Sequence, residues 1–285
     1  QMKFLHNNLL KCPLDQHALQ LDADCLRCEG GHAFDIARQG YVNLLGAADK
    51  RSRDPGDGKE MVTARRDFLS DGHYQPVADK LASLIKPQIN ADSTIVDAGC
   101  GEGYYLEQLA TQIGSSSHCR PSIIGFDISK WAIQAATRRL AATWLVASNR
   151  NIPLAANSAD CLLSLFGFPV FNSFRSVLKK EGTLLMVDAG PQHLIELRKM
   201  IYPEVRRSDS TMLQQACAAG FLEGETSTLR FQTDPLSQLQ IHQLLSMTPH
   251  LFRATREGKE RAARLDHFPV TVDIVFQRLH KAGNT

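Results

Sequence analysis

The stretch CPLDQHALQLDADCLRCEGGH, residues 12–32, gathers three cysteines and two histidines. Thiolate sulfur and imidazole nitrogen are the ligands that zinc prefers in proteins, and Cys25 and Cys28 form a C-x-x-C pair of the kind found in zinc ribbons. The same stretch has too few aliphatic residues to build a core by itself. It therefore predicts a small metal-binding module that a larger unit must hold in place.

A second chemical motif is the glycine-rich turn VDAGCGEG, residues 96–103. It lies between a short β-branched run and a helical pattern, which is where α/β proteins bind nucleotides, and its glycines let backbone amides approach a ligand. The spacing D-x-G-x-G-x-G differs from the dinucleotide pattern, and its acid can accept hydrogen bonds from an ammonium group. This favours S-adenosylmethionine over NAD; a tight structural turn is the alternative. The predicted cofactor contacts in this turn are Asp97, Gly99, Cys100, Gly101, Glu102 and Gly103.

Two further strand ends extend the predicted cofactor site. Asp127 ends the next apolar run, IIGFD, where its carboxylate can accept hydrogen bonds from both hydroxyls of a ribose. The third run ends in ASNRNIP, and many methyltransferases carry an acid where Ser148 stands. The contact to an adenine edge must therefore come from the Ser148 hydroxyl, the Asn149 amide or the backbone.

Basic residues cluster in KRSRDPGDGKEMVTARR, residues 50–66, although the net charge of the chain is only +2. Any nucleic-acid footprint must therefore be local rather than global. A solvated surface is the commoner meaning of such a run. The DPGDG in its middle predicts a turn.

The elements that must position these residues follow from the hydrophobic pattern. A chain of 285 residues with 43% apolar and 22% charged residues suffices for a full-sized core and an appendage. Short strand-like runs alternate with helical patterns from residue 93 to residue 189, which predicts a parallel sheet with helices on both faces. The alternating runs GETSTLRFQTD and FPVTVDIVFQRL near the end predict an antiparallel edge hairpin.

The sequence also bounds the cellular setting. No apolar run approaches the roughly 18 residues of a membrane-spanning helix, and no secretory apolar region stands near the start. The seven cysteines are odd in number and unevenly spaced. Together these features predict a protein of the reduced cytoplasm with no membrane partner.

Several idiosyncratic stretches together resemble one family, the RlmA-type 23S ribosomal RNA guanine-N1 methyltransferases. They span most of the chain in order: HAFDIARQGYVNLL (32–45), KRSRDPGD (50–57), ARRDFLSDGHYQP (64–76), DAGCGEGYY (97–105), GPQHLIELRKMIY (190–202) and SMTPH (246–250). The resemblance implies a class I S-adenosylmethionine-dependent methyltransferase with a Rossmann-like, mostly parallel sheet and an antiparallel edge hairpin, preceded by a zinc-ribbon-like module. It implies a zinc-ribbon-like RNA-recognition module at 1–35, a basic linker and helix at 36–75, and a methyltransferase domain at 76–285.

The resemblance also suggests zinc ligands. Relatives carry C-x-x-C followed by C-x-x-x-H, and this sequence has Asp15 in place of the second cysteine. The expected ligands are Cys12, Cys28 and His32 with either Cys25 or Asp15 as the fourth. The pattern is also compatible with His17 as a ligand, or with a module that is held by packing and binds no metal.

The remaining site residues come from the same resemblance. Tyr74 and His193 match cofactor-contacting positions, and Phe166 and Phe168, in the loop after the fourth strand, are candidates to stack a splayed-out guanine. That loop has no titratable side chain, so no catalytic base is identified. Contacts to RNA phosphates are expected from Arg38, Lys50, Arg51, Arg53, Arg65 and Arg66.

The implied function is methylation of a guanine N1 in a 23S RNA hairpin, by an enzyme that could act as a homodimer. One alternative is a methyltransferase for a small metabolite, because fold does not fix function. Another is an RNA-binding protein whose cofactor cleft has decayed. The absence of an acid at position 148, where Ser148 stands, supports this alternative.

Overall fold

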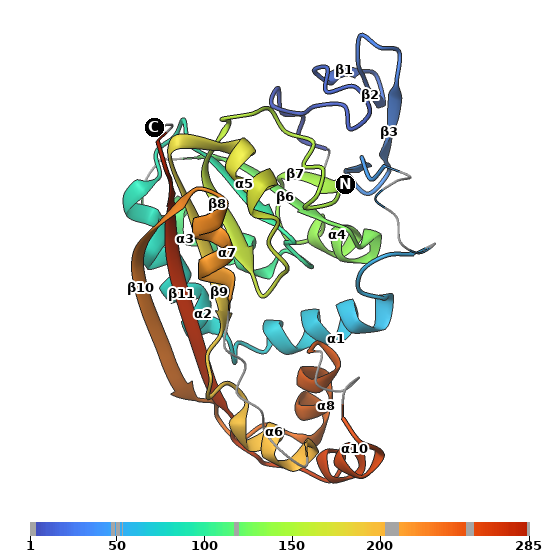
Figure 1. The fold of residues 1–285 in the computed structure, drawn as a ribbon. Coiled ribbons are helices and arrows are strands. Elements are labelled where there is room, and N and C mark those ends of the chain that lie inside the picture. The colour runs from blue at the N-terminus through green and yellow to red at the C-terminus, as the bar shows by residue number, and fades with distance from the viewer. Residues whose placement is uncertain are drawn as a thin grey trace.

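The computed structural model describes residues 4–46, 49, 52, 54–116, 120–202, 211–248 and 254–283. Its centre is one sheet with the strand order β1-β2-β3-β4-β7-β6-β5-β8-β9-β11-β10 (Figure 1). The strands are β1 (Gln20–Asp22), β2 (Cys25–Arg27), β3 (Ala33–Ala37), β4 (Tyr41–Asn43), β5 (Thr94–Ala98), β6 (Ser122–Asp127), β7 (Thr143–Val146), β8 (Ala159–Leu165), β9 (Leu178–Ala189), β10 (Phe221–Gln232) and β11 (Thr271–Lys281).

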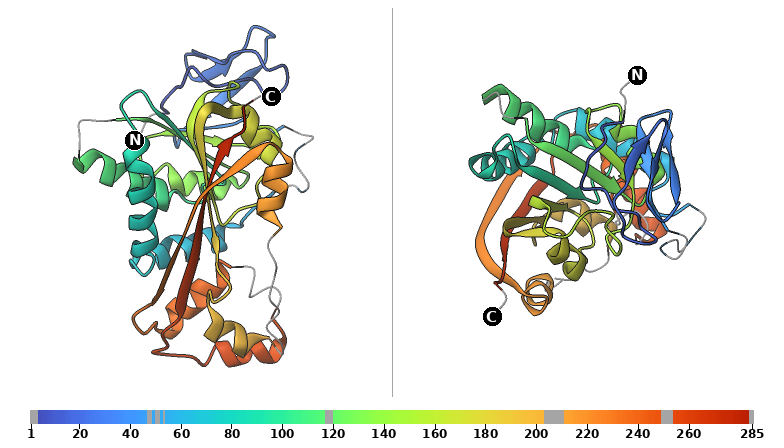
Figure 2. Two further views of the ribbon diagram at one scale, coloured as in Figure 1. Left: turned by 60° about the vertical axis from the view of Figure 1, so that its left-hand side comes forward. Right: turned by 90° about the horizontal axis from the view of Figure 1, so that it is seen from above.

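Helices cover both faces of the sheet, as the second view of Figure 2 shows. They are α1 (Lys59–Ser70), α2 (Gln75–Ile85) with the 3₁₀ turn Lys86–Gln88, α3 (Tyr104–Ser116), α4 (Lys130–Ala136), α5 (Phe171–Val177), α6 (Ile195–Ile201), α7 (Met212–Ala218), α8 (Gln238–Ser246) and α10 (Arg256–Ala262). Of the helices within these described ranges, none combines the length and apolar character that a membrane crossing needs.

The predicted parallel sheet and its antiparallel edge are confirmed. Strands β7, β6, β5, β8 and β9 are parallel neighbours, and β11 pairs antiparallel with both β9 and β10. The central strand β5, TIVDA, is buried along its whole length, as expected for a strand covered on both faces. Because β6 and β8 lie on opposite sides of β5, the strand order reverses there and leaves a crevice at the carboxyl ends of the strands.

The N-terminal module is continuous with this sheet, which the sequence pattern does not reveal. Strand β4 pairs in parallel with β7, with Val42 opposite Leu145, and the predicted boundary after residue 35 falls inside β3. Apolar side chains of the module, among them Leu19 and Leu26, belong to the same buried cluster as the sheet residues. The larger domain thus supplies the core that the module lacks.

A helical lobe lies at the far end of the long strands β9, β10 and β11, where α6 packs against α10 and α8 packs against α1 (Figures 1 and 2). Helix α8 begins with a capping box in which Ser237 and Gln240 satisfy each other's backbone N–H groups. Helix α1 therefore lies between this lobe and the sheet. That position makes it part of the cleft described next.

Candidate active site and metal centre

A cleft of about 840 Å³ opens at the carboxyl ends of the parallel strands. This volume is within the range of small-molecule sites, and the position is the crevice that the strand order creates. Its walls come from the ends of β5, β6, β7, β8 and β9 on one side. Residues of α1 and the turn after α8 form the other side, so the cleft is covered rather than open across its full width.

The glycine-rich turn between β5 and α3 lines the cleft at its centre. Gly99, Gly101 and Gly103 all have positive φ values, of 86°, 57° and 85°, a conformation that other residues adopt only at a cost. The amides of Gly99 and Cys100 are already bonded within the protein. The N–H groups of Gly99 and Cys100 both donate to the Phe126 carbonyl, because the turn folds back onto the end of β6. The turn therefore contributes its shape and its lack of side chains.

Asp97 places a carboxylate with an unused acceptor at the floor of the cleft. Its side chain is 1% exposed, and Oδ1 has no hydrogen-bond partner among the described residues. Burial, together with the nearby charge of Asp127, raises the pKa of this carboxyl to about 8. A buried acceptor of this kind requires a donor from a ligand. An ammonium group provides both the donor and the opposite charge, so the residues present fit S-adenosylmethionine.

Asp127 lies at the end of β6, as predicted, and holds the cleft in shape. One carboxylate oxygen accepts a hydrogen bond from the Gly101 N–H at 3.0 Å and the other from the Ser129 N–H at 2.8 Å. Burial raises the pKa of the carboxyl, whereas these two N–H donors lower it. Each oxygen keeps a second lone pair for a hydroxyl donor.

The turn after β7 contributes Ser148 and Asn149 to the cleft wall. The Ser148 hydroxyl accepts a hydrogen bond from the Arg150 N–H at 3.2 Å and closes the turn. The Asn149 amide donates to the Phe168 carbonyl at 2.9 Å and joins this turn to the loop after β8. Both side chains thus fix the wall, and neither is a carboxylate.

Tyr74 and His193 meet although they are far apart in the sequence. The Tyr74 hydroxyl lies 3.4 Å from His193 Nε2, and the backbone N–H of Asp273 donates to His193 Nδ1 at 3.3 Å. Because Nδ1 accepts that bond, Nε2 carries the proton and donates to the tyrosine oxygen. Both residues line the cleft and are buried. Burial raises the pKa of the Tyr74 hydroxyl, which therefore stays protonated.

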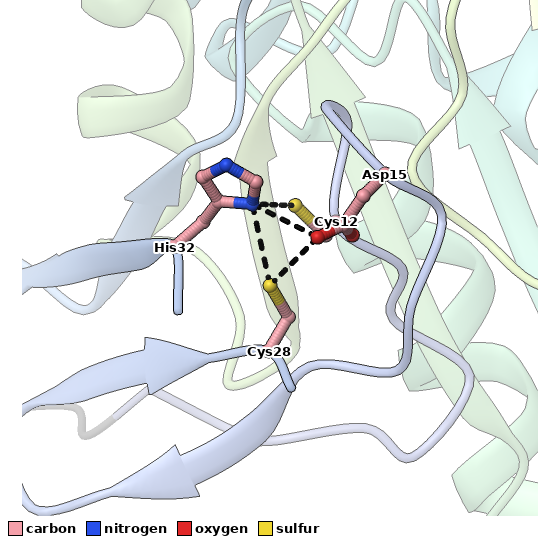
Figure 3. A group of neighbouring side chains, drawn as sticks. All are labelled: Cys12, Asp15, Cys28 and His32. Atoms are coloured by element: carbon pink, nitrogen blue, oxygen red, sulfur yellow. Dashed lines mark hydrogen bonds and ion pairs between the residues drawn. The ribbon is translucent and has the colours of Figure 1, made fainter. Parts of the chain in front are cut away.

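A compact group of metal-binding side chains lies in the N-terminal module. Cys12, Asp15, Cys28 and His32 each offer one atom, and these atoms lie within 4.8 Å of one another (Figure 3). His32 Nδ1 is 3.5 Å from Cys12 Sγ, 3.4 Å from Cys28 Sγ and 2.9 Å from Asp15 Oδ2. A tetrahedral zinc site with bonds of about 2.0 to 2.3 Å has edges of about 3.3 to 3.8 Å. The four ligand atoms would have to move only slightly closer together to bind zinc.

Asp15, rather than Cys25, completes this group. The N–H of His17 donates to Asp15 Oδ1 at 3.0 Å and holds the pKa of the carboxyl well below its usual range, so the acid is ionised and oriented. A Cβ on Gly30 would stand 2.1 Å from Asp15 Oδ2, so only glycine leaves room for the carboxylate. Cys25 lies outside the group and donates its thiol hydrogen to the Asp22 carbonyl at 3.2 Å.

The metal-binding group is connected to the cofactor cleft by hydrogen bonds. On either side of Cys12, the Lys11 N–H donates to the Pro153 carbonyl at 2.9 Å and the Pro13 carbonyl accepts from the Asn151 amide at 3.1 Å. Residues 151–153 continue the turn that carries Ser148 and Asn149. The module therefore braces one wall of the cleft.

Known families and curated relatives resemble this chain along most of its length. The N-terminal family model of RlmA, a zinc ribbon, matches residues 10–53, and a methyltransferase domain model matches residues 89–245. The 23S rRNA (guanine(748)-N(1))-methyltransferase of Streptomyces fradiae is 30% identical over 285 residues, covering 94% of this chain and 95% of the relative. A Bacillus subtilis protein named "Putative 23S rRNA (guanine-N(1)-)-methyltransferase YxjB" is 31% identical, with the same coverages.

The chain belongs to the 23S rRNA (guanine-N1)-methyltransferase family. This confirms the family and the fold class predicted from the sequence, a methyltransferase domain combined with a zinc ribbon. Among solved structures, the YcgJ protein of Bacillus subtilis aligns with a TM-score of 0.46 and 16% identity, over 71% of this chain and 98% of that one. A likeness of that size adds nothing to the assignment.

The predicted RNA contacts that the structure describes, Arg38, Arg65 and Arg66, lie in different surroundings. Arg38 is exposed in the turn after β3, and Arg66 is partly exposed beside Asp67, with 2.8 Å between Arg66 Nη2 and Asp67 Oδ1. Arg65 instead points into the cleft, where it pairs with Asp57 at 2.5 Å and donates to the Met247 carbonyl at 3.3 Å. The sequence prediction for Lys50, Arg51 and Arg53 lies outside the described residues.

Three residues line the cleft that the sequence does not predict to lie there, although Arg65 is among the expected RNA contacts. Asp57 and Arg65 form an ion pair in the cleft wall, and Asp188 lines the cleft from the end of β9. In the sequence, Asp57 is only part of a turn and Arg65 only part of a basic run. The available signal for Asp188 is its place at the end of the fifth parallel strand, equivalent to the places of Asp97 and Asp127.

Glu102 is part of the glycine-rich turn, but its carboxylate is engaged in a buried ion pair with Arg139. Its carboxylate is 1% exposed and contacts the Arg139 guanidinium, which also binds Glu107 at 2.7 Å. Burial raises the pKa of Glu102, and the charge of Arg139 opposes that rise. Glu102 therefore anchors the start of α3 to the segment after α4.

Replacing Arg139 with methionine is expected to lower the free energy of unfolding by about 3 to 5 kcal/mol, because Glu102 is left buried without its partner. Urea denaturation measures the loss, and the double variant Arg139→Met/Glu102→Gln should recover part of it. Arg256→Met is the matched control, since the Arg256 to Glu260 pair is exposed and worth at most about 1 kcal/mol. Equal losses in the two single variants would contradict the assignment.

Proposed function

We propose that this methyltransferase transfers a methyl group from S-adenosylmethionine to N1 of a guanine in 23S ribosomal RNA. The observation that carries the proposal is a similarity that spans both the metal-binding module and the cofactor cleft, to relatives named for that reaction. With ribosomal RNA as the substrate, the metal-binding module and the basic residues near it can contact the RNA. It also agrees with a cytoplasmic enzyme; the homodimer stays a prediction.

The cleft residues suggest how the cofactor is held. Asp97 would accept hydrogen bonds from the ammonium group, and the free lone pairs of Asp127 would accept those of the ribose hydroxyls. Ser148, Asn149 and the backbone of their turn would contact the adenine. The Tyr74 hydroxyl accepts a hydrogen bond from His193 Nε2, so its own hydrogen is left to be donated to a ligand. The bound cofactor supplies an electrophilic methyl group, and the protein supplies position and alignment.

The loop after β8 would receive the target base. Phe168 is 88% exposed and Phe166 is 41% exposed, although large apolar side chains rarely project so far without a partner. Phe166 also has a φ of 52°, an unfavourable conformation for a residue with a Cβ and one that often marks a functional position. Guanine N1 is accessible only after the base leaves its pairing partner, and an aromatic ring can stack the unpaired base.

The metal-binding module would help to recognise the RNA. We propose zinc bound by Cys12, Asp15, Cys28 and His32, since these atoms form the compact group. Arg38 lies in the same module and is exposed, so it is a candidate phosphate contact, and Arg66 is a second. Arg65, bound to Asp57 inside the cleft, is better suited to closing the cofactor site.

The experiment is in vitro methylation of an unmodified 23S RNA transcript by the full chain with labelled S-adenosylmethionine. Nuclease digestion and mass spectrometry should identify 1-methylguanosine at one position, with free guanosine left unmodified. Labelling of small metabolites alone would favour a small-molecule methyltransferase. Absence of binding heat with S-adenosylmethionine in calorimetry would favour a decayed RNA-binding protein; the unpaired Asp97 oxygen argues against such decay.

A further inference from the structure

The cleft holds five acidic residues, and four of them have an evident partner or task. Asp57 pairs with Arg65, Glu102 pairs with Arg139, Asp127 accepts two backbone N–H groups, and Asp97 presents its free oxygen beside the glycine-rich turn. The fifth is Asp188, at the carboxyl end of β9. Within the described part of the chain, its carboxylate has no hydrogen-bond or ion-pair partner.

Asp188 stands beside the loop that would receive the base. Strands β8 and β9 run parallel with Leu165 opposite Val187, and the Phe166 N–H donates to the Val187 carbonyl at 2.8 Å. Asp188 is therefore the immediate neighbour of Phe166. The Phe166 ring packs against Tyr105, with 6.1 Å between the ring centroids. This contact fixes the position of the Phe166 ring. A base stacked on Phe166 would lie within reach of Asp188.

The backbone around Asp188 is held firmly. It pairs with Val275 of β11, and the next residue but one, Gly190, donates its N–H to the Asp273 carbonyl at 2.7 Å. A Cβ on Gly190 would stand 2.5 Å from Asp273 Oδ2, so the glycine permits this close approach. Asp188 thus has a fixed backbone and a side chain without a partner among the described residues, as a group that acts on a substrate should have.

We infer that Asp188 is the general base, accepting the N1 proton of the target guanine as that nitrogen takes the methyl group. This rests on the proposed function. The N–H bonding pair stays on N1 and forms the new bond to the methyl carbon, the pair of the broken carbon–sulfur bond stays on sulfur, and the proton moves to the Asp188 carboxylate. A carboxylate also matches guanine, which presents N–H donors at N1 and at its 2-amino group, whereas adenine presents an acceptor at N1.

Several other titratable groups that line the cleft are poorly suited to this role. Both ring nitrogens of His193 are engaged, and burial holds the pKa values of Tyr74 and Tyr105 well above their usual range. Arg65 and Arg150 are cations. Burial alone raises the pKa of Asp188 to about 6, with no contribution from a charged neighbour. It is therefore a stronger base than an ordinary aspartate and is still ionised at neutral pH.

Asp188→Asn tests the inference, because it keeps the shape and removes the base. With saturating RNA transcript and cofactor, the rate of 1-methylguanosine formation should fall by about 100-fold to 10,000-fold. Affinity for S-adenosylmethionine should change by less than about threefold, well under the factor of ten that 1.4 kcal/mol represents. Asp188→Glu should recover part of the rate. Asp160→Asn is the matched control, at the opposite end of the neighbouring strand β8, and should keep the wild-type rate.

The pH profile separates a base from a structural residue. The wild-type single-turnover rate should rise with pH through about 6 and then level off, because the carboxylate is the active form. The asparagine variant should lack this step. A variant rate within about threefold of wild type, or an unchanged step near pH 6, would overturn the assignment. A wild-type enzyme that forms no 1-methylguanosine in RNA would sink the proposed function as well, so the two failures are distinguishable.

Discussion

Asp97→Asn is expected to weaken binding of S-adenosylmethionine by about 30-fold or more. The variant keeps the size of the side chain but removes the charge that would face the ammonium group, and neutralising one partner of a buried charge pair costs about 2 kcal/mol or more. Isothermal titration measures the loss. Asp160→Asn provides the control, because that acid binds Lys179 and the Thr94 N–H far from the cleft. Equal affinities in the two variants would remove Asp97 from the cofactor site.

The pH dependence of binding should identify Asp97 independently. In the free enzyme its pKa is raised to about 8, so at pH 7 most molecules carry the neutral acid. An ammonium group binds the carboxylate, so binding at pH 7 must release a proton, and affinity should fall by up to tenfold per pH unit below about 8. Titrations in buffers of different ionisation enthalpy measure the released proton. The proton release should disappear in Asp97→Asn.

Cys28→Ser is expected to remove the metal and unfold the ribbon. Structural zinc contributes on the order of 10 kcal/mol to the folding of such modules, and the described apolar residues of this one are shared with the sheet core rather than forming their own. Metal analysis after dialysis against a chelator should show stoichiometric zinc in the wild type and none in the variant. Affinity for S-adenosylmethionine should also fall, because Lys11 and Pro13 no longer brace residues 151–153.

Cys25→Ser is the matched control for this experiment, since it removes a thiol of the same ribbon that lies outside the ligand group. It should keep its metal. Asp15→Cys, by contrast, replaces a carboxylate with a thiolate in the group itself, and it should hold zinc at least as tightly as the wild type. Loss of metal from Cys25→Ser, with retention in Asp15→Ala, would instead make Cys25 the fourth ligand.

Local pattern was sufficient for the parallel sheet, the edge hairpin and the glycine-rich turn. Alternating strand and helix signals depend on short-range periodicity, and positive φ values at Gly99 and Gly103 follow from the spacing of the turn itself. The same pattern predicted that Asp97 and Asp127 lie at strand ends and line one cleft, because parallel strands align their carboxyl ends at one edge of the sheet. The family resemblance came from ordered stretches along the chain, which similarity to curated relatives confirmed.

The tertiary structure alone decided how those residues are used. The Gly99 and Cys100 N–H groups donate to the Phe126 carbonyl, and Arg65 lines the cleft, where it pairs with Asp57. Among the described residues, Asp15 belongs to the metal-binding group and Cys25 does not. Each outcome depends on which distant segment packs against the residue, and sequence periodicity carries no information on that choice. The same holds for the Asp188 carboxylate, which has no partner among the described residues. Whether a side chain finds a partner depends on how distant segments pack around it.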